Sequence, residues 1–521
     1  MTRRSMPYLS RASMRPVVRP RTALVPVLAL SLAACSFAPS DKPPAMPAPA
    51  HYGVNALPTQ TETAQGVSQQ FEPGAGPVKA WWQTYRSDKL NALVDEGLRN
   101  SPSLSSANHA LQAAREQLKA QVGSSLFPSI DLGGQATRER NLGIPTFGPP
   151  TALYNVFVGQ VQARYTFDFF GASRFANASL AAQVDQQAFQ LESARQALAA
   201  NIVAGAISAS VLGAQVKATE RLVDLAQADA ADMARREALG AVSRSDALAS
   251  AQTAESLAAS LPGLRAQWQS TRHALAVLLG RTPDQAPEDL SLGELRVPEK
   301  VPVAVPSTLL QTRPDIQAAE MALKAASAEV GVATAQLFPS LSLTASMGKG
   351  GFNWTTVMSN AGSLWSVGAA ITQPIFHGGA LLAQRRAAQA TYEAAVEQYK
   401  QTVLTAFRNV ADTLSSLEAD NASLRHADNA SAAAEQVFRD TAARVRLGAL
   451  PVSASRGREQ QYWNAYLTTV RATGARLSDT ALLFYAMGVP PETSADAAPP
   501  ATGEATSQTG PVPPSQNVAK R

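Results

Sequence analysis

The residue types that carry most enzymatic chemistry are sparse in this chain and lie far apart. The five histidines (51, 109, 273, 377 and 426) have no metal-binding spacing such as His-x-x-x-His. The sequence contains neither a Gly-x-Ser-x-Gly nucleophile motif nor a Walker-type phosphate loop. We therefore expect no catalytic residue, no metal site, no cofactor and no enzymatic activity.

The one cysteine, Cys35, follows a segment with the pattern of a secretory signal. Residues 1–34 hold six Arg and no acid, and the apolar run 22–34 is too short to span a membrane as a helix. The sequence Leu32-Ala33-Ala34-Cys35 resembles a bacterial lipobox, whose Cys becomes the lipidated first residue of the mature protein. We expect a signal peptide at 1–34 and an acyl anchor such as palmitate on Cys35. A buried core thiol is the alternative, but no core-like segment surrounds this residue. A lone cysteine also excludes disulfides.

The charge balance argues against nucleic acid as a partner. The chain has 45 Lys and Arg against 40 Asp and Glu, and six of the Arg lie in residues 1–34. Removing that leader leaves 39 basic and 40 acidic residues. The basic pI therefore belongs to the leader and indicates no nucleic-acid surface.

Four segments alternate between apolar and polar residues. In 155–170, every second residue from Phe157 to Phe169 is apolar or Gly, and Gln160 to Asp168 fill the other positions. Segments 130–137, 341–347 and 365–372 repeat the pattern, and Pro/Gly-rich runs at 138–154 and 348–363 predict loops that join two hairpins. One such strand fits a soluble sandwich equally well. Four of them favour strands with lipid on one face and water on the other.

The rest of the mature chain predicts long helices in two repeats. No proline occurs between Pro150 and Pro262 or between Pro374 and Pro451, and apolar residues recur every seven positions from Val396 to Leu424, which indicates coiled-coil packing. Leu-Phe-Pro-Ser at 126–129 returns at 337–340, and Arg236-x-x-x-Gly240 returns as Arg444-x-x-x-Gly448. The predicted divisions are a lipidated tether at 35–78, a first repeat at 79–282 with a membrane hairpin at 129–169, a Pro-rich linker at 283–312, a second repeat at 313–490 with a hairpin at 340–373, and a disordered tail at 491–521.

Four strands cannot close a membrane barrel, because the known minimum is about eight and open edges are not tolerated in lipid. The barrel must therefore be shared between chains. Two copies would give a narrow lumen, whereas a homotrimer gives twelve strands. The predicted fold class is mainly α with a membrane β-barrel part: a long coiled-coil α-barrel plus four strands per chain.

With these features in place, residues 80–490 resemble the TolC family of outer-membrane efflux ducts, and more narrowly its lipidated, NodT-like branch. The residues that carry the resemblance are the lipobox, Trp81-Trp82…Tyr85, Phe167-Asp-Phe-Phe-Gly171, Thr312-Arg-Pro-Asp-Ile316 and Ala335-Gln-Leu-Phe-Pro-Ser340. The resemblance implies a trimeric duct in the outer membrane with a long periplasmic extension. It also implies a periplasmic adaptor (a membrane fusion protein) and an inner-membrane resistance-nodulation-division pump, which together would export drugs and toxic amphiphiles.

The resemblance also implies functional residues at the helical tips. Arg236, Gly240, Arg444 and Gly448 fall where the adaptor docks, although each Gly is also expected as a helix C-cap. Acids beyond the tip help to close the aperture in the family, and Asp246 occupies that place in the first repeat. Residues 449–458 contain no acid. A constriction there would be apolar or cationic, formed by Leu450, Val452 or Arg456.

Two other functions remain open at the level of the sequence. The duct could serve a protein secretion system instead of drug efflux. A non-transporting coiled-coil lipoprotein of the envelope would explain the heptads and the tether, but not the four alternating strands. The cargo, the particular pump and adaptor, the true start codon and the role of the tail do not follow from the sequence.

Overall fold

The structure is a computed structural model that describes residues 37–47, 49, 51–53, 58–76, 78–142 and 151–489. The predicted signal peptide, Cys35 and the predicted tail at 491–521 lie outside the described residues. The chain divides into two compact units, and each unit takes segments from both sequence repeats. Unit 1 comprises 1–49, 101–191 and 315–408, and unit 2 comprises 50–100, 192–314 and 409–521.

The described elements are distributed between the two units. Unit 1 holds α3 (Pro102–Leu126), β2 (Ser129–Leu142), β3 (Thr151–Phe167), most of α7 (Pro314–Ala335), β5 (Ser340–Gly351), α8 (Trp354–Met358), η4 (Asn360–Gly362), β6 (Ser363–Thr372), and the first parts of α4 (Ala172–Ala238) and α9 (Ala380–Arg446). Unit 2 holds β1 (Gln70–Pro73), η1 (Trp81–Tyr85), α2 (Asp88–Asn100), α5 (Arg244–Leu278), η2 (Pro283–Gln285), η3 (Leu292–Glu294), β4 (Lys300–Val303), α6 (Pro306–Thr312), α10 (Val452–Met487), and the remainders of α4 and α9.

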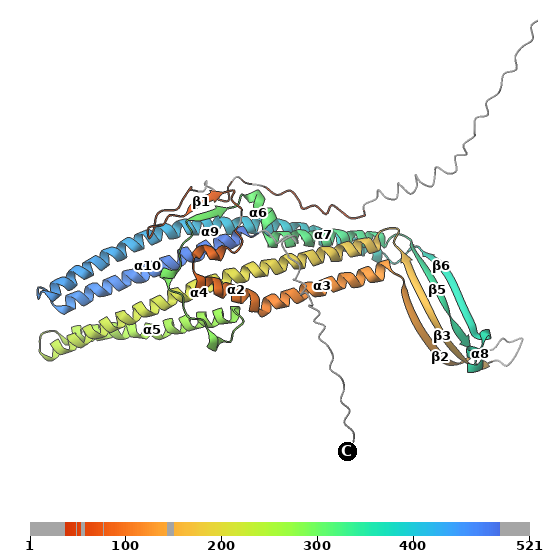
Figure 1. Cartoon of the computed structure of the whole chain (residues 1–521), viewed down its shortest axis with the longest axis horizontal. Helices are drawn as coiled ribbons and strands as arrows, with labels where there is room; N and C mark the ends of the chain where they lie inside the picture. Colours follow the sequence, from red (N-terminus) through yellow and green to blue (C-terminus); the bar gives the residue numbers. More distant parts are fainter. Residues whose placement is uncertain are drawn as a thin grey trace, which may run out of the picture. The chain divides into compact units, whose positions relative to one another are not determined.

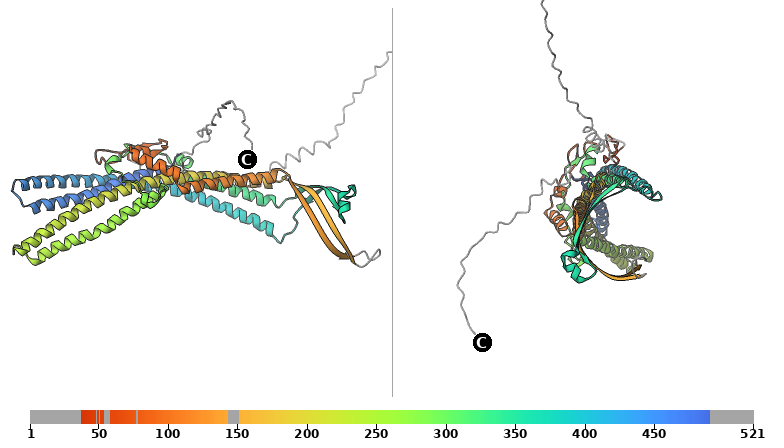
Figure 2. Two further views of the ribbon diagram at one scale, coloured as in Figure 1. Left: turned by 60° about the horizontal axis from the view of Figure 1, so that its bottom comes forward. Right: turned by 90° about the vertical axis from the view of Figure 1, so that its right-hand side faces the viewer.

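The four alternating segments form one antiparallel sheet in unit 1. Its strand order is β2-β3-β5-β6, so the pairing of β3 with β5 joins the two hairpins. Figure 1 shows the strands side by side with α8 at one end, and Figure 2 shows that the sheet is curved. The loop predicted at 138–154 was too long. The β2–β3 ladder continues through Arg138↔Asn155 and Arg140↔Leu153, because paired strands satisfy their backbone groups beyond the alternating pattern.

The two long helices are uninterrupted. α4 and α9 each contain 67 residues without a break. The heptad positions Val403, Val410, Leu417 and Leu424 on α9 are all completely buried. The sevenfold spacing therefore does mark a packed seam.

One described helix, α4, is long and apolar enough to cross a membrane by length and composition alone. However, 61% of its most apolar window is buried inside the protein. That degree of burial is typical of a core helix.

In unit 2, equivalent glycines of the two sequence repeats pack in the same way. Gly280 and Gly488 end the two helical hairpins with φ of +76° and +71°. A Cβ at Gly280 would lie 2.6 Å from the carbonyl oxygen of Asn100, and one at Gly488 would lie 2.9 Å from that of Thr312. Gly280 therefore lets one hairpin end pack against the chain just before α3, and Gly488 lets the other pack against the chain just before α7. A side chain at either position would clash with the backbone of that segment.

Two short strands were missed by the sequence analysis. β1 and β4 form a separate two-stranded parallel sheet, with Phe71 opposite Val301. β4 and the short helix α6 lie inside the segment predicted only as a Pro-rich linker. Each strand has four residues and contains a proline, so neither shows the alternation or length that would predict it.

A pair of half-buried carboxyl groups faces each other across α9 and α10 in unit 2. Burial, together with the adjacent Asp479 carboxyl, raises the pKa of Asp420 to about 6. Burial also raises the pKa of Asp479. Two neighbouring carboxylates repel each other when both are charged, so the pair is most stable when one of them carries a proton.

This pair predicts a pH-dependent stability. A carboxyl group whose folded pKa is raised stabilises the fold below its unfolded pKa near 4, and that contribution is lost as the pH rises through about 6. Asp420→Asn is therefore expected to raise the melting temperature at pH 8 more than at pH 5. Thermal melts of the purified protein at both pH values check this. Glu418→Gln, which replaces an exposed acid on the same helix, is the matched control. An equal shift for Asp420→Asn at both pH values would contradict the shared proton.

Candidate functional site: the sheet faces and the helical tips

The register of the sheet in unit 1 places like residues in rows that cross all four strands. Leu132, Val161, Met347 and Trp365 lie opposite one another and form an apolar row. Asp131, Gln162, Ser346 and Ser366 form the next row, in which the two serine hydroxyls are 2.9 Å apart. Successive rows point to opposite faces. The sheet therefore has one apolar face and one polar face, as the alternation predicted.

The apolar face is exposed to an extent that is unusual for a packed sheet. Leu132 is 82% exposed, Trp365 80% and Ile371 74%. A contiguous exposed apolar face of this kind marks contact with lipid or with another protein.

Aromatic side chains lie at both ends of an apolar stretch within β3. Phe157 stacks on Trp354, with centroids 5.0 Å apart, at one end, and Tyr165 meets Phe167 at 5.0 Å at the other. Phe157 and Tyr165 are separated by about 26 Å of extended strand. Outer-membrane strands have an apolar band of about 25 Å between two aromatic girdles. The geometry of β3 matches that band.

The two helical hairpins of unit 2 turn in the same way. The amide of Ala241 donates to the Arg236 carbonyl at 2.8 Å, and the amide of Ala449 donates to that of Arg444 at 2.9 Å. Gly240 and Gly448 hold the left-handed conformation between these ends, with φ of +73° and +74°. Both glycines are therefore helix C-caps.

Each tip also presents a leucine that the sequence analysis did not single out. Leu239 is 83% exposed and Leu447 is 84% exposed, and each directly precedes the capping glycine. The repeated Arg-x-x-Leu-Gly spacing could have identified both residues. Arg236 does not project freely from its tip, because its guanidinium lies 3.1 Å from the Asp232 carboxylate on the same helix.

The aperture candidates differ in their surroundings. Asp246 lies in the first turn of α5, whose N-cap is Ser243: the Ser243 hydroxyl accepts from the Asp246 amide at 3.1 Å and donates to the Asp246 carboxylate at 2.7 Å. Leu450 and Val452 are exposed beside the second tip, at 36% and 58%. Both remain available to form an apolar surface.

Arg456 is engaged within the protomer. Its side chain is 17% exposed and forms an ion pair with Asp229 on α4, and a second one at 3.4 Å with Asp232. Gln460 donates to the same Asp229 carboxylate at 3.0 Å. These contacts hold Arg456 against α4, whereas the sequence alone suggested a cation lining a constriction.

The α4–α10 contact extends away from the tip. Arg221 pairs with Glu459 at 2.7 Å, and Arg471 donates to Gln215 at 3.4 Å. Gly474 removes the side chain that would collide with Val211. Polar pairs near the tip and close packing farther along therefore join the two hairpins in one protomer.

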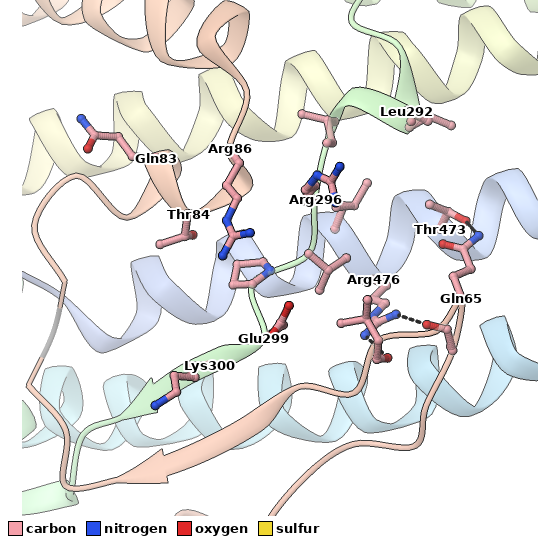
Figure 3. Close-up of a pocket in the computed structure, with 17 residues that line it drawn as sticks. Gln65, Gln83, Thr84, Arg86, Leu292, Arg296, Glu299, Lys300, Thr473 and Arg476 are labelled. Carbon is pink, nitrogen blue, oxygen red and sulfur yellow. Dashed lines mark hydrogen bonds between the residues drawn. The ribbon is translucent and has the colours of Figure 1, made fainter.

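A cavity of about 720 Å³ in unit 2 is closed on one side by the segment before β1 (Figure 3). The guanidinium of Arg476, which is almost fully buried, donates to the carbonyls of Ala64 and Val67, each at 3.0 Å. Burial lowers the pKa of Arg476 to about 10, so the residue stays charged at neutral pH. This buried cation fastens the 64–67 segment to α10.

Among the described residues, no group of three or more His, Cys, Asp or Glu side chains gathers into a metal site.

Comparison with known proteins identifies the family. The model of the outer membrane efflux protein family matches residues 93–281 and 305–489. The chain is 27% identical over 476 residues to the pyoverdine export outer membrane protein OpmQ of Pseudomonas putida, which covers 90% of this chain and 97% of that protein. It is 27% identical to nodulation protein T of Rhizobium leguminosarum bv. trifolii over 77% of this chain and 82% of that protein.

A solved structure shares the fold. The outer membrane channel CmeC of Campylobacter jejuni superimposes with a TM-score of 0.75 at 21% identity, covering 87% of this chain and 95% of that one. The amphipathic sheet, the repeated hairpins and the family match agree. This chain belongs to the outer membrane efflux protein family, with nodulation protein T among its relatives, and it acts in the outer membrane as an exit duct for efflux.

Proposed function

We propose that three copies of this chain form a lipid-anchored duct that passes small molecules from an inner-membrane pump and its periplasmic adaptor to the outside. The observation that carries the proposal is the open sheet β2-β3-β5-β6. It has a lipid-type face and a polar face, and its end strands β2 and β6 each pair on one side only within the described chain. Three such sheets would complete a twelve-stranded barrel whose polar rows line the lumen.

Acylation of Cys35 is part of this proposal. A single acyl chain holds a protein on a membrane only marginally. The sheet would therefore supply most of the anchoring, and the lipid would hold the N-terminal segment at the membrane surface. A signal peptide at 1–34, a tether at 35–78, an α-barrel built from the two long repeats and a tail at 491–521 remain the proposed division of the chain.

Adaptor docking is proposed at the two tips. Exposed Leu239 and Leu447 would enter grooves on the adaptor, while Gly240 and Gly448 keep the turns tight enough to insert. Arg236 and Arg444 would flank these contacts. The shared backbone geometry of the tips supports a partner that meets two similar surfaces in each protomer.

The contact between α4 and α10 is proposed as the latch that keeps the aperture closed. Breaking the Arg456–Asp229 pair would release the α9–α10 hairpin from α4 and let the tip swing outward. Leu450, Val452 and Asp246 remain candidates for the residues that line the aperture and narrow it when the latch is closed. Either single substitution removes the ion pair that joins α10 to α4, so either one should open the latch.

A duct for a protein secretion system remains the second candidate, because an open lumen does not itself select cargo. The export functions carried in the names of relatives, such as pyoverdine export for OpmQ, favour small molecules.

The first prediction concerns the shared barrel. Light scattering of the detergent-extracted protein should give the mass of three mature chains. Leu132→Arg should abolish the trimer in the outer membrane, because an Arg on the lipid face costs about 2–4 kcal/mol at mid-membrane in each protomer. Asp131→Arg, one residue away on the polar face, should leave the trimer intact. A monomeric wild-type protein would leave the duct proposal without support.

The second prediction concerns the tips. Leu239→Asp combined with Leu447→Asp should abolish efflux-dependent drug resistance and adaptor co-purification, because each charge would have to be buried in the adaptor groove. Trimer yield and channel conductance in lipid bilayers should not change. Val277→Asp, at the opposite end of α5 and 60% exposed, is the control. Retained adaptor binding in the double variant would place docking elsewhere.

The third prediction separates a latch from a constriction. Asp229→Ala and Arg456→Ala should each raise the closed-state conductance of single channels, and the double variant should raise it no further than either alone. If Arg456 were instead a pore-lining cation, Asp229→Ala would leave the conductance low and only the arginine substitution would change it. Glu220→Ala, which breaks the Arg265–Glu220 pair between α4 and α5, is the control that spares the α4–α10 contact.

A further inference from the structure

A pocket of about 350 Å³ lies in unit 1, where the ends of the strands meet the starts of α4 and α9. Its walls are mostly aromatic and aliphatic, formed by Phe167, Phe169, Phe170, Phe338, Pro339 and Leu381. Asp168 and His377 also line it. The volume is typical of sites that enclose a small ligand or part of a larger one. Neither the polar face of the sheet nor the tips of the hairpins make use of it.

The N-terminal segment approaches this pocket. The ring of Phe37, the first described residue, lies 4.9 Å from the ring of Phe338. The ring of Phe338 in turn stacks on that of Phe170, also at 4.9 Å. Phe37 therefore touches one of the walls that enclose the pocket.

Two hydrogen bonds fix the course of the chain toward that wall. Tyr392 on α9 donates its hydroxyl to the Ser40 carbonyl at 3.0 Å, and Ser327 on α7 donates to the Pro39 carbonyl at 2.9 Å. From Ser40 back to Phe37 the segment follows α7 toward the start of β5. Three separate contacts thus hold the segment on unit 1.

Cys35 lies two residues before Phe37 in the sequence. Two residues of chain reach at most about 7 Å. An acyl chain on Cys35 would therefore start close to the Phe338 wall, and its length would let it enter the pocket. The pocket offers the apolar surface that such a chain needs, and its aromatic walls supply large contact areas.

We propose that this pocket binds an acyl chain carried by Cys35 of the same protomer, which rests on the proposed lipidation. The acyl chain would then fasten the N-terminus to the base of the sheet and would be a packed component of the protomer as well as a membrane anchor. A bilayer phospholipid is the competing occupant. The N-terminal segment held at the pocket wall favours the chain's own lipid, because attachment makes that acyl chain locally concentrated.

The test is a photo-crosslink in the intact protein. Cells that express the full chain are grown with a fatty acid carrying a diazirine, irradiated, and the protein is purified from membranes and digested. The expected product joins the acylated Cys35 peptide to a peptide containing residues 166–173 or 335–340. The intact mass of the unirradiated protein is measured in parallel and reports acylation independently.

Each other outcome overturns the assignment in a distinct way. If the same peptides carry a labelled phospholipid that is not attached to Cys35, the occupant is bilayer lipid. If Cys35 is acylated but crosslinks elsewhere, only this proposal fails. If the intact mass shows no acyl group, the proposed lipid anchor fails together with it.

Two variants test the pocket itself. Leu381→Trp should abolish the crosslink by filling the pocket, while the Phe37–Phe338 contact is retained. Phe338→Ala should abolish it by removing the shared wall. Phe352→Ala makes the same change beside Tyr154, away from the pocket-lining residues, and should leave the crosslink at the wild-type level. Trimer yield is checked for every variant, and an undiminished crosslink in a trimeric Leu381→Trp protein would overturn the proposal.

Discussion

The structure depends above all on the need to satisfy backbone hydrogen bonds where no water is present. Within β2, β3, β5 and β6 the ladders pair almost every residue, but among the described residues the outer sides of β2 and β6 have no strand partner. In water such edges would be a moderate liability, and in lipid they are prohibitive. The exposed apolar row from Leu132 to Trp365 imposes a related requirement, because that face of the sheet is stable only in contact with lipid or protein. This need for partner strands is the physical basis of the proposed trimer.

The helical part solves a different problem. A single 67-residue helix has far too little apolar surface to fold alone, so each long helix packs along a seam of small and aliphatic residues. Because the chain is duplicated, the same packing arrangement occurs in both repeats. Gly280 and Gly488 let the backbone of a preceding segment pack closely against the ends of the two hairpins. Gly240 and Gly448 form the same turn at the hairpin tips. Differences between the repeats are therefore informative. Beyond the first tip, the Asp246 carboxylate accepts a hydrogen bond from the helix cap Ser243, whereas the second hairpin contributes Arg456 to a contact with α4.

The polar contacts of unit 2 separate into groups with different roles. Arg476 is buried and donates to backbone carbonyls, so it fastens the segment before β1 to α10. Arg456 and Asp229 are only partly shielded, and solvent could replace each partner at moderate cost. The second arrangement fits the proposed latch, because water can solvate both partners when they separate. In unit 1 the ring contact of Phe37 with Phe338 likewise holds a segment in place, together with the hydrogen bonds to the Pro39 and Ser40 carbonyls.

The sequence by itself determined the alternating strands, the buried heptads, the repeated tips and the family. Each of these features depends on periodicity or on a short motif, and both involve residues that lie close together in the sequence. It could not show β1 and β4, because four-residue strands containing proline have no periodic signal. The repeated Arg-x-x-Leu-Gly spacing marks Leu239 and Leu447 as equivalent positions, but their exposure depends on how each tip packs and so follows only from the tertiary structure. It also suggested a pore-lining role for Arg456, whereas Asp229, distant in sequence, neutralises that cation. Only tertiary structure brings such residues together, because which helix faces which is set by the packing of the whole repeat.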